Sequence, residues 1–323
     1  MPDSSCDAIR RISCHALQLT TVRLLLSETK NAPAMRRKLK WILKSWVLPP
    51  AIMQLINRVR DFYTLNVHRS RQDRRLLRQN IALKDRHIGA RCFILGAGLS
   101  IAKQDLRKLK GEFVISVSNT FVHQEFPFFR PRYHVTPSLL EGHSQYYTED
   151  RFVDWLKEME RGTLDAEMFF HVGDRGMIER NGLFKNRKIH WTEYCSWDGD
   201  MSTSINLAKV PHIWSVSELA ITIAIYLGFD QIYLLGIDHD WFIGPQVYFY
   251  DQVRQHALQP HLIDLGVDSE FQMRRHADIF KKYKYLYGIK KNIYNATANP
   301  NHYLDVFPKV SYDALFINPA GHG

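Results

Sequence analysis

A short apolar segment followed at once by a glycine-rich turn constrains this chain most. Residues 91–95 read RCFIL, and Gly96-Ala97-Gly98-Leu99-Ser100 comes directly after them. Residues 99–109 then carry apolar side chains at helical spacing, and a second apolar stretch, Phe113–Val117, follows. Strand, turn, helix and strand in this order form a βαβ unit, whose two strands run parallel. The sequence therefore predicts a parallel sheet that starts at residue 91.

The chain beyond this unit continues the alternation of strands and helices. Helical spacing predicts helices over residues 152–161, 214–226 and 271–287. Strands that alternate with helices pack as an open, mostly parallel sheet flanked by helices. We therefore predict an α/β, modified Rossmann-like fold. Further strands are expected at the apolar stretches Tyr133–Val135, Glu167–His171, Gln231–Gly236 and Lys291–Asn295.

The positive charge of the chain is concentrated near its start. Residues 1–91 hold 19 Lys and Arg against 6 Asp and Glu, whereas the remainder holds 24 against 27. Such asymmetry is typical of an arm that meets an anionic surface, either lipid or nucleic acid. We therefore divide the chain into a basic helical N-terminal extension, residues 1–88, and a Rossmann-like domain, residues 89–323.

Two helices are expected in the basic extension. Residues 36–63 have helical amphipathicity with a kink at Pro49–Pro50, because proline cannot continue a helix interior. Trp41 and Trp46 lie among Lys and Arg side chains, which is the composition of a helix lying in the headgroup layer of a membrane. A solvated basic helix docked on its own domain fits the same pattern. A second basic helix is predicted over Val67–Lys84.

The sequence predicts neither a membrane-spanning helix nor a secretory signal, and its cysteines do not predict a disulfide framework. No run of eighteen apolar residues exists, which predicts no membrane-spanning helix. Met1–Arg11 leads into no apolar stretch with a small-residue cleavage site, so we expect no secretory signal. The cysteines are scattered without a CxxC motif, which favours structural thiols in a reducing cytoplasm: Cys6, Cys14, Cys92 and Cys195.

The turn at Gly96–Ser100 is the first candidate site. Glycines let a backbone approach a ligand closely, and the N-terminus of a following helix offers free N–H groups to a phosphate. Ser100 can cap that helix as well as contact a ligand. Ordinary strand–helix turns also carry glycines, and neither a full GxGxxG motif nor a P-loop is present. Asn119 and Pro137-Ser138 follow the next two strands, at the same edge of the sheet, where Asn119 can equally serve a turn.

A second candidate site follows the most apolar predicted strand. Gly236-Ile237-Asp238-His239-Asp240 places two carboxylates and an imidazole at a strand's carboxyl end. Asp238 and Asp240 form a DxD pattern that can chelate a divalent cation, while a helix cap with solvated charges is the plainer alternative. Tyr248 and Tyr250 can donate to a leaving phosphate or simply pack. His276 is a candidate base on a basic helix, although a lone histidine on such a helix more often lies at the surface.

Four motifs in one order resemble a known family. ILGAGLS, the Asn119 of SVSNTF, the PSL after the third strand, and ELAITIAIYLGFDQIYLLGID together resemble the bacterial lipooligosaccharide sialyltransferases. They equally resemble the wider MptE-like group, which includes the flagellin motility accessory factors. The likeness covers residues 90–305. It implies a transferase that takes a nonulosonic acid from a CMP-sugar, with inversion and with no metal cofactor.

The resemblance also implies roles for individual residues. Gly96, Gly98 and Ser100 would meet the phosphate and ribose, with Asn119 near the phosphate. Ser215 and Ser217 match the turn that holds the cytidine, and Asp238 would sit at the nucleotide or sugar. Tyr248 would assist the departure of CMP. The remaining nucleotide-binding positions that we expect around these groups are Ala97, Thr136, Ser138, Gly236 and Tyr250.

This chain departs from the family pattern at three places. Ala97 and Leu99 stand where the family's glycine motif, GNGPS, has Asn and Pro, and Thr136 stands for the Asn before the PS. The family's histidine base falls near Phe271, so His276 is the nearest substitute and His239 is its rival.

Our leading interpretation is a glycosyltransferase of bacterial surface polysaccharide assembly, which includes lipopolysaccharide, O-antigen and capsule. It would bind a nucleotide-sugar donor and a glycan or lipid-linked acceptor on the cytoplasmic face of the membrane, with the basic arm peripheral on the anionic leaflet. A homo-oligomer is compatible with this interpretation. The alternatives are a transferase that uses a nucleoside-diphosphate sugar with Mg²⁺ or Mn²⁺, or a pterin diphosphokinase. A nucleic-acid-binding protein is disfavoured, because the domain beyond the arm carries a negative balance.

Overall fold

The computed structural model describes residues 50–140, 148–196, 205–240, 248–250, 269–300 and 303–317. The chain divides into two compact units, Met1–Tyr63 and Thr64–Gly323. The second unit contains all the strands described below, together with residues 64–88, which we had assigned to the N-terminal extension.

A seven-stranded parallel sheet forms the centre of the second unit, in the order β5-β4-β3-β2-β1-β8-β9. The chain runs from β1 outward to β5 on one side, then returns to add β8 and β9 on the other side of β1. The topological switch point therefore lies between β1 and β8. The strands are β1 (Arg91–Leu95), β2 (Phe113–Val117), β3 (Tyr133–Val135), β4 (Glu167–His171), β5 (Ile189–Thr192), β8 (Gln231–Leu235) and β9 (Ile293–Asn295).

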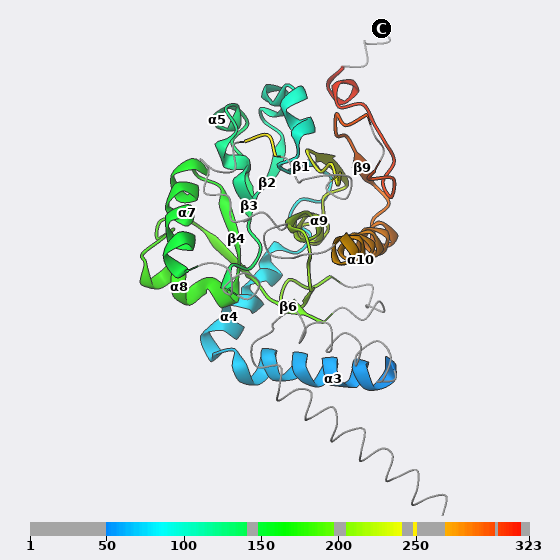
Figure 1. Cartoon of the computed structure of the whole chain (residues 1–323). Helices are drawn as coiled ribbons and strands as arrows, with labels where there is room; N and C mark the ends of the chain where they lie inside the picture. Colours follow the sequence, from blue (N-terminus) through cyan, green and yellow to red (C-terminus); the bar gives the residue numbers. More distant parts are fainter. Residues whose placement is uncertain are drawn as a thin grey trace, which may run out of the picture. The chain divides into compact units, whose positions relative to one another are not determined.

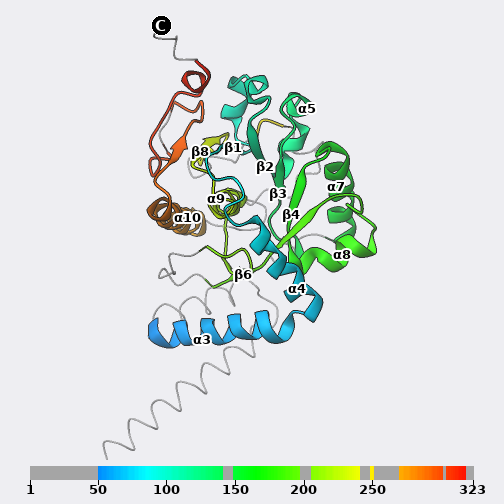
Figure 2. The same ribbon diagram turned by 180° about the vertical axis from the view of Figure 1, so that it is seen from behind.

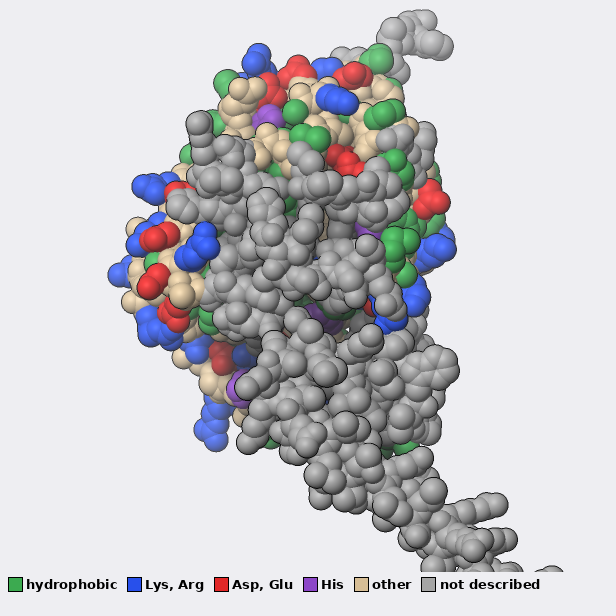
Figure 3. Space-filling view, viewed as in Figure 1, with side chains coloured by type: hydrophobic (Ala, Val, Ile, Leu, Met, Phe, Trp, Pro, Cys, Tyr) green, Lys and Arg blue, Asp and Glu red, His purple; other side chains and the backbone are tan. Residues whose placement is uncertain are grey.

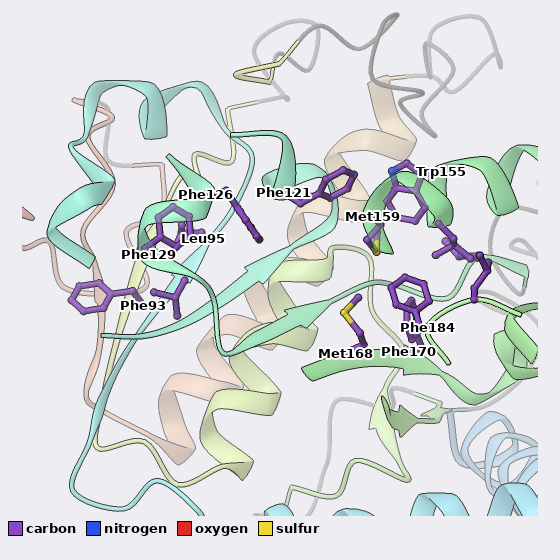
Figure 4. Packing of buried hydrophobic residues seen from close by; sticks show 14 of the residues in the cluster. Phe93, Leu95, Phe121, Phe126, Phe129, Trp155, Met159, Met168, Phe170 and Phe184 are labelled. Atoms are coloured by element: carbon purple, nitrogen blue, oxygen red, sulfur yellow. The ribbon is translucent and has the colours of Figure 1, made fainter. Parts of the chain in front are cut away.

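Two separate apolar clusters cover the two faces of this sheet. On one face α9 (Val216–Tyr226) and α10 (Ser269–Ile289) lie side by side, as both views show (Figures 1 and 2). Alternate β1 residues divide between the faces: Ile94 packs on the α9 side, whereas Phe93 and Leu95 join the cluster on the other. That second cluster contains Phe121, Trp155 and Phe170 and is drawn in Figure 4. It is covered by α7 (Glu149–Gly162), α8 (Arg175–Arg180) and short 3-10 turns.

Residues 64–88 are built into the α/β unit by polar contacts. Ser70 begins α4 (Arg71–Gln79) with a capping box, in which its side chain accepts from the Asp73 N–H and its own N–H donates to Asp73. The Asn80 side chain donates to the Trp191 carbonyl of β5, 2.6 Å away. Arg69 forms a buried ion pair with Glu193, just beyond β5. Residues 69–80 are therefore attached to β5, the edge strand of the sheet, and to the residue that follows it.

The strands predicted from the sequence are confirmed, with shifts of one or two residues at the ends of two of them. The helix predicted over residues 99–109 was wrong. Two 3-10 turns, η4 (Leu99–Lys103) and η5 (Leu106–Leu109), take its place. The chain is extended between them because Gln104 donates its side-chain N–H to the Ala296 carbonyl and Asp105 caps the second turn. The sequence analysis missed β5, α8 and a small sheet of β6 (Tyr194–Cys195) and β7 (Val210–Pro211).

The second basic helix is shorter than predicted, because the capping box at Ser70 delays its start and a 3-10 turn, η3 (Asn80–Leu83), ends it.

On the face drawn in Figure 3, the visible Lys and Arg side chains of the described residues are interspersed with Asp and Glu.

One helix of the first unit is described, α3 (Pro50–Tyr63). It starts at the second proline of the predicted kink, where the missing N–H of proline costs no helical bond. Its large apolar side chains recur at helical spacing along one stripe, and they are exposed: Ile52, Leu55, Ile56, Val59, Phe62 and Tyr63. Trp41 and Trp46 of the predicted helix lie outside the described residues. None of the helices that the structure describes is long and apolar enough to cross a membrane.

Candidate functional site

The candidate residues gather at the carboxyl ends of β1, β2 and β8, around the switch point. Open α/β sheets bind their ligands at this edge because the loops from neighbouring strands diverge there and leave backbone groups exposed. The turn after β1 and the loop after β8 are joined directly, since the Gly98 N–H donates to the Gly236 carbonyl over 2.8 Å.

The two glycines of the turn are required by the loop after β8. A Cβ at Gly96 would overlap the carbonyl oxygen of Gly236, and one at Gly98 would lie 2.5 Å from Oδ2 of Asp238. Gly236 itself adopts a φ of +61°, which favours glycine. The backbones of the two loops therefore lie so close together that no side-chain carbon fits between them. The glycine pattern that suggested ligand contact is already explained by this internal contact.

Asp238 binds the turn rather than open solvent. Its Oδ2 accepts from the backbone N–H of Ser100 over 2.9 Å, and its Oδ1 accepts from the Ser100 hydroxyl. Burial raises the pKa of this carboxyl and the charge of Asp240 raises it further, while the bonds from Ser100 and the charge of Lys309 lower it. Asp238 thus acts as a cap for η4 and holds Gly96–Ser100 in place.

A short segment with two tyrosines pairs with the same turn. Tyr248 forms an antiparallel bridge with Gly98, and the Phe249 N–H donates to the Ala97 carbonyl over 3.2 Å. The rings of Tyr248 and Tyr250 are stacked, with centroids 5.2 Å apart. Burial raises the pKa of Tyr250 to about 12, partly offset by a hydrogen bond with Asn119. The structure therefore brings Tyr248, Tyr250 and Asn119 together with the turn.

Thr136 and Ser138 lie further along the sheet and are engaged with their own surroundings. The Thr136 hydroxyl donates to the Phe169 carbonyl, and the Ser138 N–H donates to the Tyr194 hydroxyl over 3.1 Å. The next two N–H groups, of Leu139 and Leu140, donate to the buried carboxylate of Asp174. The loop after β3 is therefore fixed from within the protein.

The first turn of α9 contributes the serines that the resemblance assigned to the cytidine. Ser215 is the N-cap, and Glu218 completes a capping box by accepting from its N–H over 2.6 Å. Glu218 also forms an ion pair with Lys282 of α10 over 3.1 Å, with both side chains at most 3% exposed. Burial raises the pKa of Glu218, while the Lys282 charge lowers it. This pair fixes α10 against the start of α9.

Two histidines face each other beside this helix pair. His239, after β8, and His276, on α10, have ring centroids 6.0 Å apart in an edge-to-face arrangement. Burial lowers the pKa of His239 to about 3 and that of His276 to about 4, and the charge of Arg275 lowers both further. His239 has a φ of +50°, an uncommon conformation for this residue. Both imidazoles are therefore neutral at pH 7.

Arg275 supplies a positive charge close to both histidines and to Tyr248. Its Nη2 donates to the Trp214 carbonyl over 2.7 Å, just before α9. Burial lowers its pKa, and the proximity of Tyr248 and Glu218 raises it. A guanidinium remains charged under such conditions, because its ordinary pKa is above 12.

The DxD pair forms no carboxylate cluster in the part of the chain that the structure describes. No group of three or more His, Cys, Asp or Glu side chains among these residues is arranged as ligands of a metal ion. The oxygens of Asp238 are engaged by Ser100. Asp240 interacts with Asp238 through its charge alone.

Four residues that contact or face the candidate residues were not predicted from the sequence: Glu218, Arg275, Lys282 and Tyr283. The capping pattern S-x-x-E at Ser215–Glu218 was a usable signal for Glu218. Lys282 and Tyr283 carry no such signal, because they lie on a Lys- and Tyr-rich helix whose buried side shows only in three dimensions.

Comparisons with known proteins assign the chain to no family. No protein-family model and no curated protein sequence matches it. Among solved structures, it is similar to the sialyltransferase CstII from Campylobacter jejuni, which was determined in complex with the substrate analogue cytidine-5'-monophosphate. The two are 16% identical, the match covers 69% of this chain and 86% of that one, and the TM-score is 0.37.

The close contact of the two loops predicts the effect of a single methyl group. Gly98→Ala should lower the free energy of unfolding by about 1–3 kcal/mol, because the new Cβ displaces the Asp238 carboxylate. Urea unfolding measures this. Gly288→Ala is the matched control, since its Cβ meets nothing within 4 Å inside α10 and should leave stability equal or higher. If the two variants were equally stable, the close approach of Gly98 to the Asp238 carboxylate would be contradicted.

The neutral histidines predict a loss of stability in acid. Below pH 6.5 the two histidines become protonated in the unfolded chain but stay neutral in the folded protein. The free energy of unfolding is therefore highest above pH 6.5 and decreases as the pH falls toward 4. In His239→Asn the slope of unfolding free energy against pH should decrease by about 1 kcal/mol per pH unit. The control is His68→Asn, at an exposed site. An unchanged slope in His239→Asn would show that His239 is protonated in the fold.

Proposed function

We propose that the protein is an inverting glycosyltransferase that takes a sugar of the nonulosonic-acid type from a CMP-sugar donor. One observation carries the proposal: the turn after β1, Asn119, two tyrosines and Arg275 converge at the switch point beside two neutral histidines. This set contains hydrogen-bond donors for a phosphate and candidate bases for an acceptor hydroxyl. The order of sequence motifs that resembles the lipooligosaccharide sialyltransferases supports the donor class.

The departing group needs its negative charge stabilised as the glycosidic bond breaks. CMP leaves with a single phosphate, and tyrosine hydroxyls, a guanidinium and backbone N–H groups can stabilise it in a dehydrated site. Tyr248 and Tyr250 are stacked, and Tyr250 keeps its proton because burial raises its pKa to about 12. Arg275 adds a full charge close to Tyr248. These groups are proposed to hold the phosphate.

The acceptor hydroxyl must lose its proton to a base. Both histidines are neutral at pH 7, so each has one ring nitrogen that carries no proton. The negative phosphate of a bound donor would raise their low pKa values toward the working pH, as a general base requires. His276 is our choice, because Nε2 of His239 is already engaged by the Tyr283 hydroxyl over 2.6 Å. His276 follows Arg275 on α10, and Arg275 is close enough to Tyr248 for their charges to interact. Asp238 is proposed to act indirectly, by holding the turn through Ser100.

The donor class predicts which nucleotide stabilises the fold. CMP should raise the melting temperature in the presence of EDTA, with a stabilisation of about 2.7 kcal/mol at a concentration one hundred times its Kd. A thermal-shift series with CMP, CDP, UDP, GDP and ATP, with and without Mn²⁺, measures this. Cytidine is the control for the phosphate. Stabilisation by UDP or GDP only with Mn²⁺ would replace the CMP-sugar donor with a nucleoside-diphosphate sugar, and stabilisation by ATP with a metal ion would favour the diphosphokinase.

We further propose that α3 attaches the enzyme to an anionic membrane, where a lipid-linked acceptor of surface polysaccharide assembly would lie. Its apolar stripe is exposed, with Leu55 62%, Val59 61% and Phe62 65% accessible. Arg58 and Arg60 lie on the same helix and are exposed as well. An apolar stripe beside basic side chains fits the boundary between anionic headgroups and acyl chains.

Two charges on the apolar stripe should release the protein from vesicles. Leu55→Glu with Val59→Glu should weaken binding to phosphatidylserine-containing vesicles at least tenfold, because two large apolar side chains no longer enter the bilayer. Co-sedimentation measures this, and high salt should weaken the wild-type binding. Ile88→Glu is the control, since Ile88 is 72% exposed in the second unit. Equal binding of the double variant would place the attachment elsewhere.

A further inference from the structure

A chain of three hydroxyls connects the first turn of α9 to His239. The Ser215 and Ser217 hydroxyl oxygens are 2.7 Å apart, and Ser217 shares a hydrogen bond with the Tyr283 hydroxyl over 2.6 Å. Tyr283 in turn shares one with Nε2 of His239, also over 2.6 Å. The loop after β8, α9 and α10 each contribute a member. Three elements far apart in sequence are thus tied together at one point.

These hydrogen-bonded hydroxyls lie in the interior of the protein. Tyr283 is fully buried, and Ser217 and His239 are 4% and 6% exposed. Hydrogen bonds in such a setting are stronger than in water, and a broken one leaves an expensive unpaired group. Each hydroxyl has a single hydrogen to give, so the direction in which the three hydroxyls donate is coupled to which nitrogen of His239 carries the proton.

The hydrogen-bonded hydroxyls can influence the proposed base, His276, because His239 lies between Tyr283 and His276 in the series of contacts. His239 presents an edge-to-face contact to His276, and Phe280 lies about equally far from both, at 6.0 and 6.1 Å between ring centroids. Among the described residues, the charge of Arg275 acts on both histidines, and the charge of Glu218, which is paired with Lys282, acts on Tyr283. Two imidazoles at this distance cannot both take a proton without mutual repulsion.

We propose that Tyr283 is a positioning residue, which fixes the orientation and tautomer of His239 so that the acceptor's proton is taken by His276. The inference rests on the proposed function for the identity of the base, but the arrangement of the three side chains does not. His239 remains neutral while His276 accepts a proton from the acceptor hydroxyl, whose oxygen then bonds to the anomeric carbon as the bond to CMP breaks. Tyr283 itself contacts neither the donor nor the acceptor.

Tyr283→Phe tests the proposal because it removes only the hydroxyl. We expect kcat with a CMP-sugar to fall at least tenfold, while KM for the donor changes less than about twofold. In ¹⁵N spectra of the histidine side chains, the wild type should show His239 in one tautomer, and the variant a mixture, with a changed His276 signal. Ser217→Ala keeps Tyr283 and should give a smaller change of the same kind. The double variant should be no worse in kcat than Tyr283→Phe, because both act through one chain.

Tyr226→Phe is the matched control, since it also removes a buried tyrosine hydroxyl, which donates to the Asn80 carbonyl over 3.1 Å. It should lower the melting temperature to a similar degree and leave kcat and both histidine signals unchanged. An unchanged His239 tautomer in Tyr283→Phe, or a fall in kcat equal to that of Tyr226→Phe, overturns the proposal. If the wild type transfers no sugar from any CMP-sugar, the proposed function fails, while the histidine spectra still decide whether Tyr283 sets the tautomer.

Discussion

The bond between the Asp238 carboxylate and Ser100 is the interaction on which the rest of the site depends. It joins the loops of β1 and β8, the two strands on either side of the switch point. Because Gly96 and Gly98 lack side chains, the two backbones approach closely enough for that bond to form. Tyr248 then pairs with Gly98, which brings the stacked tyrosines over the same edge of the sheet. A carboxylate that a sequence pattern suggests for metal or catalysis is here the support of the site.

The sequence predicted the α/β class and the strands of the sheet well, because their apolar runs are buried on both faces. The candidate residues were expected at one edge of the sheet for a related reason: parallel strands present their carboxyl ends there, so the residues that follow each strand meet. Residues after β1, β2 and β8 do meet there. The helix after β1 was mispredicted, because Gln104 and Asp105 form side-chain bonds that favour two separate turns, and helical spacing alone does not reveal such bonds.

What the sequence could not provide were contacts between distant elements. His239 and His276 are 37 positions apart, and their neutral state follows from burial between β8, α9 and α10. Tyr283 is one of several tyrosines on α10, and only its position opposite Ser217 distinguishes it. The boundary between the basic extension and the α/β unit has the same origin: Arg69 looks like one more arm residue until it is seen paired with Glu193.

The central claim, that a cytidine nucleotide binds at the switch point, can be tested most directly by hydrogen exchange of the backbone amides with and without CMP. The account predicts that CMP slows exchange at least tenfold in the turn Gly96–Ser100 and in the first turn of α9, Val216–Leu219. Exchange in the distant strand β5, Ile189–Thr192, should stay the same. Protection confined to other segments, or no protection at a CMP concentration that raises the melting temperature, would contradict the claim.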